Sequence, residues 1–198
     1  MKMLPVGADP LDVRYNMVQW VHRSTRGWSY GSSISDPRTG EIIKGHVSLG
    51  SLRIRQDFLI AQALQAPYKK DAVDDDFALQ MAIARIRQLS AHEIGHTLGF
   101  AHNFAASTNG RASVMDYPHP KFSLKENKID FSNAYDTKIG VWDKVTVAYF
   151  YQEFEKDEEN ELHKILEDAF ASGLKYLSDA DARSQGSASS SAHMWDNG

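Results

Sequence analysis

The chain has 198 residues, 42% of them hydrophobic, and carries a net charge of −4 at pH 7. This size allows one good hydrophobic core, so we expect a single domain over residues 1–198. The mildly acidic balance gives no reason to expect a nucleic acid as partner. No apolar run reaches the roughly 18 residues that a membrane-spanning helix needs. The sequence contains no cysteine, which excludes disulfides and cysteine metal ligands.

The first part of the chain predicts a helix followed by a β-hairpin. Asp9-Pro10 has the chemistry of a helix N-cap with proline in the first turn, and apolar residues at helical spacing extend this helix over 11–22. Strands are expected at 27–36 and 41–50, because the residues at 36–40 include a proline and a glycine that favour a tight turn. The two strands should therefore pair in antiparallel fashion.

The rest of the chain is expected to be mainly helical. Apolar spacing predicts helices at 52–64, 77–98, 138–154 and 162–177. The loop at 67–76 contains Asp74 to Asp76, which are more simply helix caps than calcium ligands, because no spaced calcium-binding pattern is present. Residues 122–137 are polar and are expected to be irregular.

Residues 92–102 read His-Glu-Ile-Gly-His-Thr-Leu-Gly-Phe-Ala-His and carry the main functional signal. On a helix, His92 and His96 lie on one face, one turn apart. Gly99 can end the helix in a sharp turn that brings His102 back as a third ligand. Neutral imidazoles bind zinc, and three protein ligands leave the fourth tetrahedral position to water, which is typical of catalytic sites. The motif therefore predicts one catalytic Zn²⁺ ion.

Glu93 is expected to act as the general base of this site. It points about 100° away from His92 around the helix, so it is badly placed to join both histidines on the metal. It can instead reach a water molecule whose pKa zinc has lowered, and later pass the proton to a leaving amine. This chemistry predicts metal-assisted hydrolysis of an amide bond.

The residues Ser113-Val114-Met115-Asp116-Tyr117 follow the histidine motif. A helix with the pattern H-E-x-x-H-x-x-G-x-x-H, followed by a methionine-containing turn, resembles the metzincin clan of zinc peptidases. That resemblance implies that Met115 forms an apolar floor beneath the three histidines in a Met-turn. The turn resembles those of the astacin and serralysin branches, which implies that Tyr117 approaches the metal and stabilises the oxyanion. The simpler alternatives are an ordinary core methionine and a core tyrosine.

Most of the chain also resembles the metzincin segment of large bacterial zinc-dependent metalloproteases. The residues that carry this resemblance are Asp9-Pro10, Gln19–Ser24, Asp36–Ile42 and Trp142–Lys144. It implies an α+β (α/β-like metzincin) fold with a small twisted mixed sheet, an active-site helix, a Met-turn and a helical C-terminal part. We expect the sheet and the active-site helix within 1–117, a mainly helical subdomain at 118–183 and a loose tail at 184–198.

The resemblance also implies a zinc-dependent endopeptidase, present here as a segment of a larger protein that acts on peptide or protein substrates. Metzincin domains ordinarily begin with a strand before their first helix, so we expect part of the sheet to lie upstream of this chain. Met1–Pro5 lacks the apolar core of a signal peptide. A secreted, periplasmic or cell-envelope location is therefore expected through a larger precursor. We expect an extended peptide substrate to pair with strand 41–50 at the sheet edge.

Two alternative functions remain open at this stage. In a thermolysin-like site, Glu126 would replace His102 as the third ligand, although it falls in a loop and would leave His102 without a role. The chain could also be a zinc-binding but catalytically inactive module of a larger protein, although such a module needs no Glu93. The other histidines are expected to be structural or exposed, with His119 bordering the cleft; they are His22, His46, His119, His163 and His193.

Overall fold

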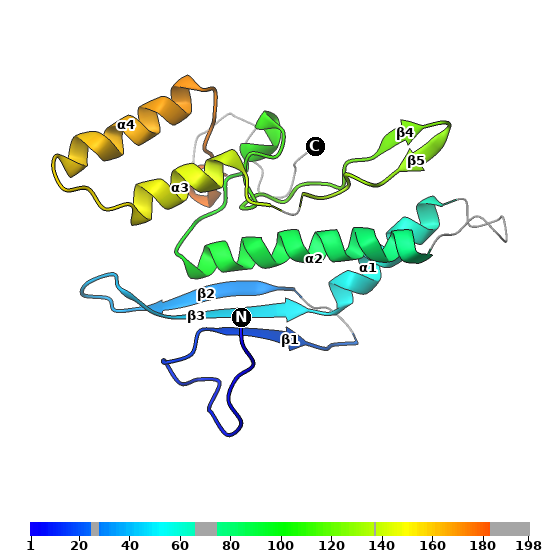
Figure 1. Cartoon of the computed structure of the whole chain (residues 1–198), viewed down its shortest axis with the longest axis horizontal. Coiled ribbons are helices and arrows are strands. Elements are labelled where there is room, and N and C mark those ends of the chain that lie inside the picture. Colours follow the sequence, from blue (N-terminus) through cyan, green and yellow to red (C-terminus); the bar gives the residue numbers. More distant parts are fainter. Residues whose placement is uncertain (25–27, 66–74, 137, 183–198) are drawn as a thin grey trace.

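The computed structural model describes residues 1–24, 28–65, 75–136 and 138–182. The fold is mixed α+β, as the sequence predicts, with a three-stranded sheet, a two-stranded sheet and several helices. The long helix α2 (Asp75–Thr97) lies between the three-stranded sheet and the C-terminal part of the chain (Figure 1). The tail expected at 184–198 lies outside the described residues.

The main sheet contains β1 (Met17–Val21), β2 (Tyr30–Ser35) and β3 (Ile42–Gly50), in the order β1-β3-β2. β2 and β3 form the predicted antiparallel hairpin, and β1 pairs with β3 in parallel. β3 is therefore the central strand, and the expectation that 41–50 forms the sheet edge is wrong. The physical reason is that β1 occupies the side of β3 opposite β2, which leaves β2 as an edge.

The helix predicted over 11–22 is absent, and the same residues form turns followed by β1. Asp9, which suggested a helix cap, instead accepts from the Leu11 amide at 2.8 Å in a local turn, and Asp12 accepts from the Arg14 amide at 2.9 Å in the next. The buried Lys44 ammonium donates to main-chain carbonyls of this segment, including that of Asp12 at 3.0 Å. Pairing with β3 thus outweighs the helical spacing.

α1 (Leu52–Leu64) occupies the predicted range, and α2 begins at Asp75, two residues before the predicted start. The two helices pack around a core that includes Ala61, Ala78 and Met81, all at most 3% exposed. α2 also lies against β2 and β3, and the α2–β2 contact is very close. A Cβ atom added to Gly31 would lie 1.9 Å from the main-chain oxygen of Glu93. Glycine at this position allows the sheet to touch the helix.

The C-terminal part has helices near the predicted ranges 138–154 and 162–177, but the second ends at Ala171, so Leu174 and Leu177 lie outside it. Two short helices and one hairpin were not predicted. The elements of this part are η1 (Ala106–Asn109), β4 (Ser123–Lys125), β5 (Lys128–Asp130), α3 (Val141–Tyr151), α4 (Glu158–Ala171) and α5 (Asp179–Ala182). The expectation of irregular structure at 122–137 is wrong for the β4–β5 hairpin. Its two turn residues, Glu126 and Asn127, both have positive φ, the geometry of a tight hairpin turn. Their sequence lacks the usual glycine.

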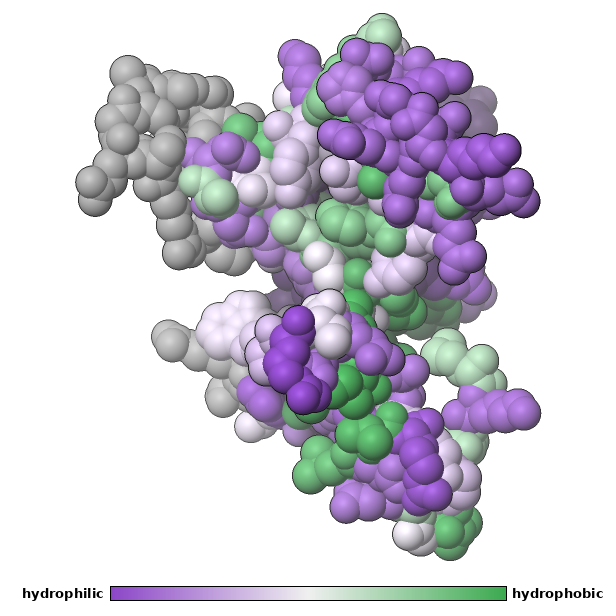
Figure 2. Space-filling view, turned by 90° about the vertical axis from the view of Figure 1, so that its left-hand side faces the viewer, coloured by the Kyte–Doolittle hydropathy of each residue, from purple (hydrophilic) through white to green (hydrophobic). Residues whose placement is uncertain are grey.

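Aromatic contacts join the C-terminal helices to the end of α2. The Phe100 ring lies 6.0 Å from the rings of both Phe150 and Tyr151, and the Tyr151 hydroxyl donates to the Leu98 carbonyl at 2.8 Å. Seen from the end, hydrophobic residues gather at the narrow junction between the sheet and the largely hydrophilic helical part (Figure 2).

Within the described residues, no helix has both the length and the apolar character needed to cross a membrane.

Replacing Gly31 with alanine should strongly destabilise the protein. The added methyl group meets main-chain atoms of α2, which cannot rotate away, so β2 and α2 must separate. Overpacking of this kind costs roughly 1–3 kcal/mol or more of unfolding free energy, measurable by urea denaturation. Ser32→Ala, at an exposed position of the same strand, is the matched control and should stay within about 0.5 kcal/mol of wild type. Equal stabilities of the two variants would contradict the close β2–α2 contact.

Candidate active site

The end of α2 turns the chain as the motif predicts. The Gly99 amide donates to the His96 carbonyl at 3.1 Å, and the Phe100 amide donates to the Gly95 carbonyl at 3.1 Å. Gly99 itself has φ of +85°. Together these features form the Schellman termination of a helix, in which glycine adopts the left-handed conformation at low cost. The turn carries His102 back toward the last turns of α2.

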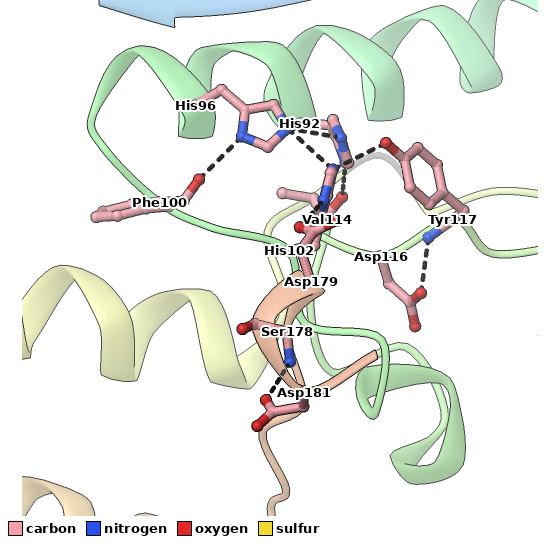
Figure 3. A network of polar contacts seen from close by, with 10 residues as sticks. All are labelled: His92, His96, Phe100, His102, Val114, Asp116, Tyr117, Ser178, Asp179 and Asp181. Atoms are coloured by element: carbon pink, nitrogen blue, oxygen red, sulfur yellow. Dashed lines mark hydrogen bonds and ion pairs between the residues drawn. The ribbon is translucent and has the colours of Figure 1, made fainter. Parts of the chain in front are cut away.

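The three histidines of the motif meet at one point (Figure 3). The Nε2 atom of His96 lies 3.1 Å from Nε2 of His92 and 3.1 Å from Nε2 of His102. Among the described residues, these three form the group of side chains that could hold a metal ion. Nitrogen ligands about 2.0–2.1 Å from a tetrahedral ion are separated by roughly 3.3 Å. The observed spacing therefore fits one zinc ion.

The other ring nitrogen of each histidine faces an oxygen. His92 Nδ1 lies 2.6 Å from the Val114 carbonyl, His96 Nδ1 lies 2.9 Å from the Phe100 carbonyl, and His102 Nδ1 lies 2.7 Å from Oδ2 of Asp179. Oxygen acceptors require the hydrogen on Nδ1, so each Nε2 presents a bare lone pair to the other two. Three lone pairs at this spacing repel one another unless a cation lies between them. The donor set thus fits a divalent metal.

The turn containing Met115 lies directly below this helix. Met115 is 3% exposed and packs against Gly95, where an added Cβ would lie 2.3 Å from the methionine sulfur. The buried Asp143 at the start of α3 holds the turn in place. Its carboxylate accepts from the Ser113 hydroxyl at 2.5 Å and from the Val114 amide at 2.9 Å. Asp143 therefore fixes the residue whose carbonyl orients His92, a role that the sequence alone did not reveal.

Glu93 is buried beside the histidines. Burial raises its pKa to about 7, while a hydrogen bond from the Gly31 amide and the nearby Arg85 guanidinium oppose the rise. The same desolvation lowers the pKa of His92 to about 3 and also lowers that of His96, so both rings stay neutral near pH 7. A carboxyl with a pKa of about 7 can both take and give a proton at neutral pH.

Tyr117 directs its hydroxyl at the histidine group (Figure 3). Its hydroxyl oxygen lies 2.8 Å from Nε2 of His102, and its ring lies 5.2 Å from that of His92. Burial, together with the carboxylates of Glu93 and Asp179, raises the pKa of Tyr117 to about 12. The phenol therefore keeps its proton at neutral pH and is available as a hydrogen-bond donor.

A cavity of about 940 Å³ opens onto the histidines and Glu93. Its volume is at the upper end of the range of small-molecule sites, roughly 300–1,000 Å³. Its walls come from β2 and the residues before it, from α1, from α2 and from the loop at 117–120. Arg53 and Arg85 contribute positive charge to the wall, and His119 lines the cavity as expected. The site is thus open to a ligand of several residues.

The remaining candidates lie away from the histidine group. Glu126 is exposed at the tip of the β4–β5 hairpin and does not join the group. His46 is half-buried in β3, and His163 is exposed beside Glu167 on α4 at 3.1 Å. His193 lies outside the described residues. The arrangement therefore supports His102, and not Glu126, as the third member of the group.

Comparison with known proteins identifies the family. Residues 74–198, well over half of the chain, match the model of the Met-zincin family, and the chain belongs to that family. Searches of curated proteins and of solved structures gave no match. The matched range includes α2 and the three histidines, whereas β1, β2, β3 and α1 precede it. Family and geometry together support a zinc metallopeptidase-type domain.

Replacing Glu93 with glutamine should stabilise the metal-free protein at high pH. The folded state binds the Glu93 proton up to about pH 7 but the unfolded state only up to about pH 4.5, so wild-type stability falls as pH rises through this window. The variant has no charge to bury. We expect its gain in stability over wild type to be about 2–3 kcal/mol larger at pH 8.5 than at pH 5.

Urea denaturation in the presence of a chelator at both pH values measures this difference. Glu126→Gln, which removes an exposed carboxylate, is the control and should show no such pH-dependent gain. A Glu93 variant that is equally stable relative to wild type at pH 5 and pH 8.5 would show that Glu93 is not buried as described.

Proposed function

We propose that this domain is a zinc-dependent metalloendopeptidase. The observation that carries the proposal is the convergence of three imidazole Nε2 atoms beside a buried carboxylate, at the wall of an open cavity. Membership of the Met-zincin family supports the same class. The edge strand β2 in the cavity wall favours an extended peptide, which is why we propose action within a chain.

In this proposal His92, His96 and His102 hold the ion, and Met115 supports them from below. A zinc ion bound there supplies a Lewis acid that polarises the scissile carbonyl and lowers the pKa of a water molecule. Glu93 takes the proton of the attacking water and then delivers it to the leaving amine. Its pKa of about 7 suits both steps.

Tyr117 is proposed to stabilise the oxyanion. Its hydroxyl lies on the cavity side of the histidine group, 2.8 Å from Nε2 of His102, and it keeps its proton at neutral pH. The hydroxyl lies beside the nitrogen of His102 that faces the proposed metal, and an O–H donor near the position where negative charge develops lowers the barrier. The proposal therefore gives Tyr117 a role in turnover more than in substrate binding.

The substrate is proposed to lie along β2 and not along β3. β2 is the edge strand that reaches the cavity, with Tyr30 and Gly31 in its wall. An extended peptide can add to such an edge through main-chain hydrogen bonds, and pockets for alternate side chains then give selectivity. The Gly31 amide also bonds Glu93, so this edge lies directly beside the proposed base.

The competing function is a zinc-binding module without activity. Such a module would keep the three histidines but would have no use for an ionisable carboxyl at position 93. The buried carboxyl costs stability whenever it is charged, which favours a catalytic role for Glu93. Metal content and peptide cleavage, measured on the same samples, separate the two functions.

Glu93→Gln should abolish cleavage and leave the metal bound. We expect kcat/KM on a mixed peptide library to fall about 10²–10⁴-fold, because the general base is lost. The zinc content should stay at one ion per chain. Glu126→Gln is the control and should change neither quantity. Zinc-loaded wild type without any cleavage that depends on Glu93 would instead identify an inactive module, and loss of zinc from the Glu126 variant would favour the thermolysin-like ligand set.

A bound substrate mimic should protect β2 from hydrogen exchange. A peptidomimetic hydroxamate that occupies the cavity would pair with the free edge of β2, so amides in 30–35 should exchange more slowly in the complex. β1 (17–21) lies at the far edge of the same sheet and serves as the internal control. Slower exchange at β1 with no change at β2 would refute the proposed substrate path. Exchange is followed by mass spectrometry with and without the inhibitor.

A further inference from the structure

The segment that follows α4 returns to the loop containing His102. Asn103 is 0% exposed, and its amide group donates to the Lys175 carbonyl at 2.9 Å and accepts from the Leu177 amide at 3.2 Å. The Phe104 amide donates to the Leu177 carbonyl at 2.8 Å. Three hydrogen bonds thus fix residues 175–177 against the two residues that directly follow His102.

This attachment places α5 beside the histidine group. The Ser178 amide donates to the Asp181 carboxylate at 2.9 Å, and the Asp181 amide donates to the Ser178 carbonyl at 3.1 Å, so the start of the short helix is closed by its own residues. Asp179 then directs its carboxylate at His102, with Oδ2 2.7 Å from Nδ1 (Figure 3). The two residues are 77 positions apart in the chain.

His102 differs from the other two histidines in how it is held. His92 and His96 belong to the rigid helix α2, and main-chain carbonyls accept from their Nδ1 atoms. His102 lies in the loop after the helix, and its Nδ1 partner is a charged side chain. A carboxylate partner fixes the tautomer and the ring orientation. It also makes the other ring nitrogen more basic, and therefore a stronger ligand for a metal ion.

We propose that Asp179 is a positioning residue of the metal centre, and that the segment 175–182 is a working part of that centre. Asp179 holds the hydrogen of His102 on Nδ1 and keeps Nε2 directed at the ion. Asn103 acts indirectly, because its hydrogen bonds hold the segment that carries Asp179. The inference rests on the three-histidine zinc site of the proposed function.

The test is the zinc dissociation constant, measured by competition with a chromophoric chelator at pH 7.5. Asp179→Asn should weaken zinc binding about 10–100-fold, the usual effect of removing a carboxylate that orients a histidine ligand. Asp168→Asn removes an equal charge from an exposed position on α4 and should bind zinc as wild type does. A dissociation constant for Asp179→Asn within about threefold of wild type would overturn the proposal.

Two further readouts separate positioning from a general loss of structure. The metal-free Asp179→Asn protein should melt at the wild-type temperature, and its Co²⁺ form should show shifted visible bands. Asn103→Ala should lower both the zinc affinity and the melting temperature, because it releases the whole segment. A lower melting temperature for Asp179→Asn with an unshifted Co²⁺ spectrum would show a merely structural residue and overturn the proposal.

The His102→Ala variant shows whether the role of Asp179 alone is wrong or whether the proposed three-histidine zinc site is wrong. If His102→Ala loses zinc and Asp179→Asn does not, the zinc site stands and only the role of Asp179 is wrong. If His102→Ala binds zinc as tightly as wild type, the three-histidine site is wrong, and the role of Asp179 falls with it.

Discussion

The site depends on three imidazole nitrogens whose lone pairs face one another, with Nε2 of His96 3.1 Å from Nε2 of each of the other two histidines. This arrangement is unfavourable by itself, because each ring has its hydrogen on the outer nitrogen and none lies between the inner ones. The protein must therefore hold each ring in the orientation that presents its lone pair to a cation. It does so with one oxygen acceptor per ring, and each acceptor is itself fixed by a different part of the fold.

The three acceptors differ in how far they lie along the chain from their histidines. The Phe100 carbonyl comes from the helix termination itself and needs only the glycine turn. The Val114 carbonyl comes from the turn beneath the helix, which Asp143 ties to the start of α3. The carboxylate of Asp179 comes from the end of the described chain. The C-terminal part is thus built around the site and is not an appendage to it.

The difference between local and distant partners explains which features the sequence could predict. The histidine group, the turn at Gly99 and the helix at 52–64 follow from local spacing and local turn chemistry, and the structure has all three. The partners Asp143 and Asp179 lie 29 and 77 residues from the groups they contact, and local spacing does not indicate either contact.

The errors in the prediction have the same origin. Residues 11–22 have helical spacing, but a partner strand 29 residues away decides their conformation. β3 has the pattern expected of either a central or an edge strand, and its position in the sheet depends on where β1 pairs. Gly31 gives no local signal, since its importance comes from a helix that begins 44 residues later. Sequence spacing therefore predicts the three histidine ligands better than it predicts the strand pairing and helix contacts that surround them.

The contact between β2 and α2 connects the two halves of the proposed chemistry. Because Gly31 has no side chain, the strand reaches the main chain of Glu93, and its amide bonds the carboxyl group. That hydrogen bond favours the charged form of Glu93, while burial favours the neutral form, and burial is the larger effect. A substrate that displaces water from this edge adds to the burial and favours the protonated form further. β2, which is proposed to bind the peptide, thus also influences the pKa of Glu93, the proposed general base.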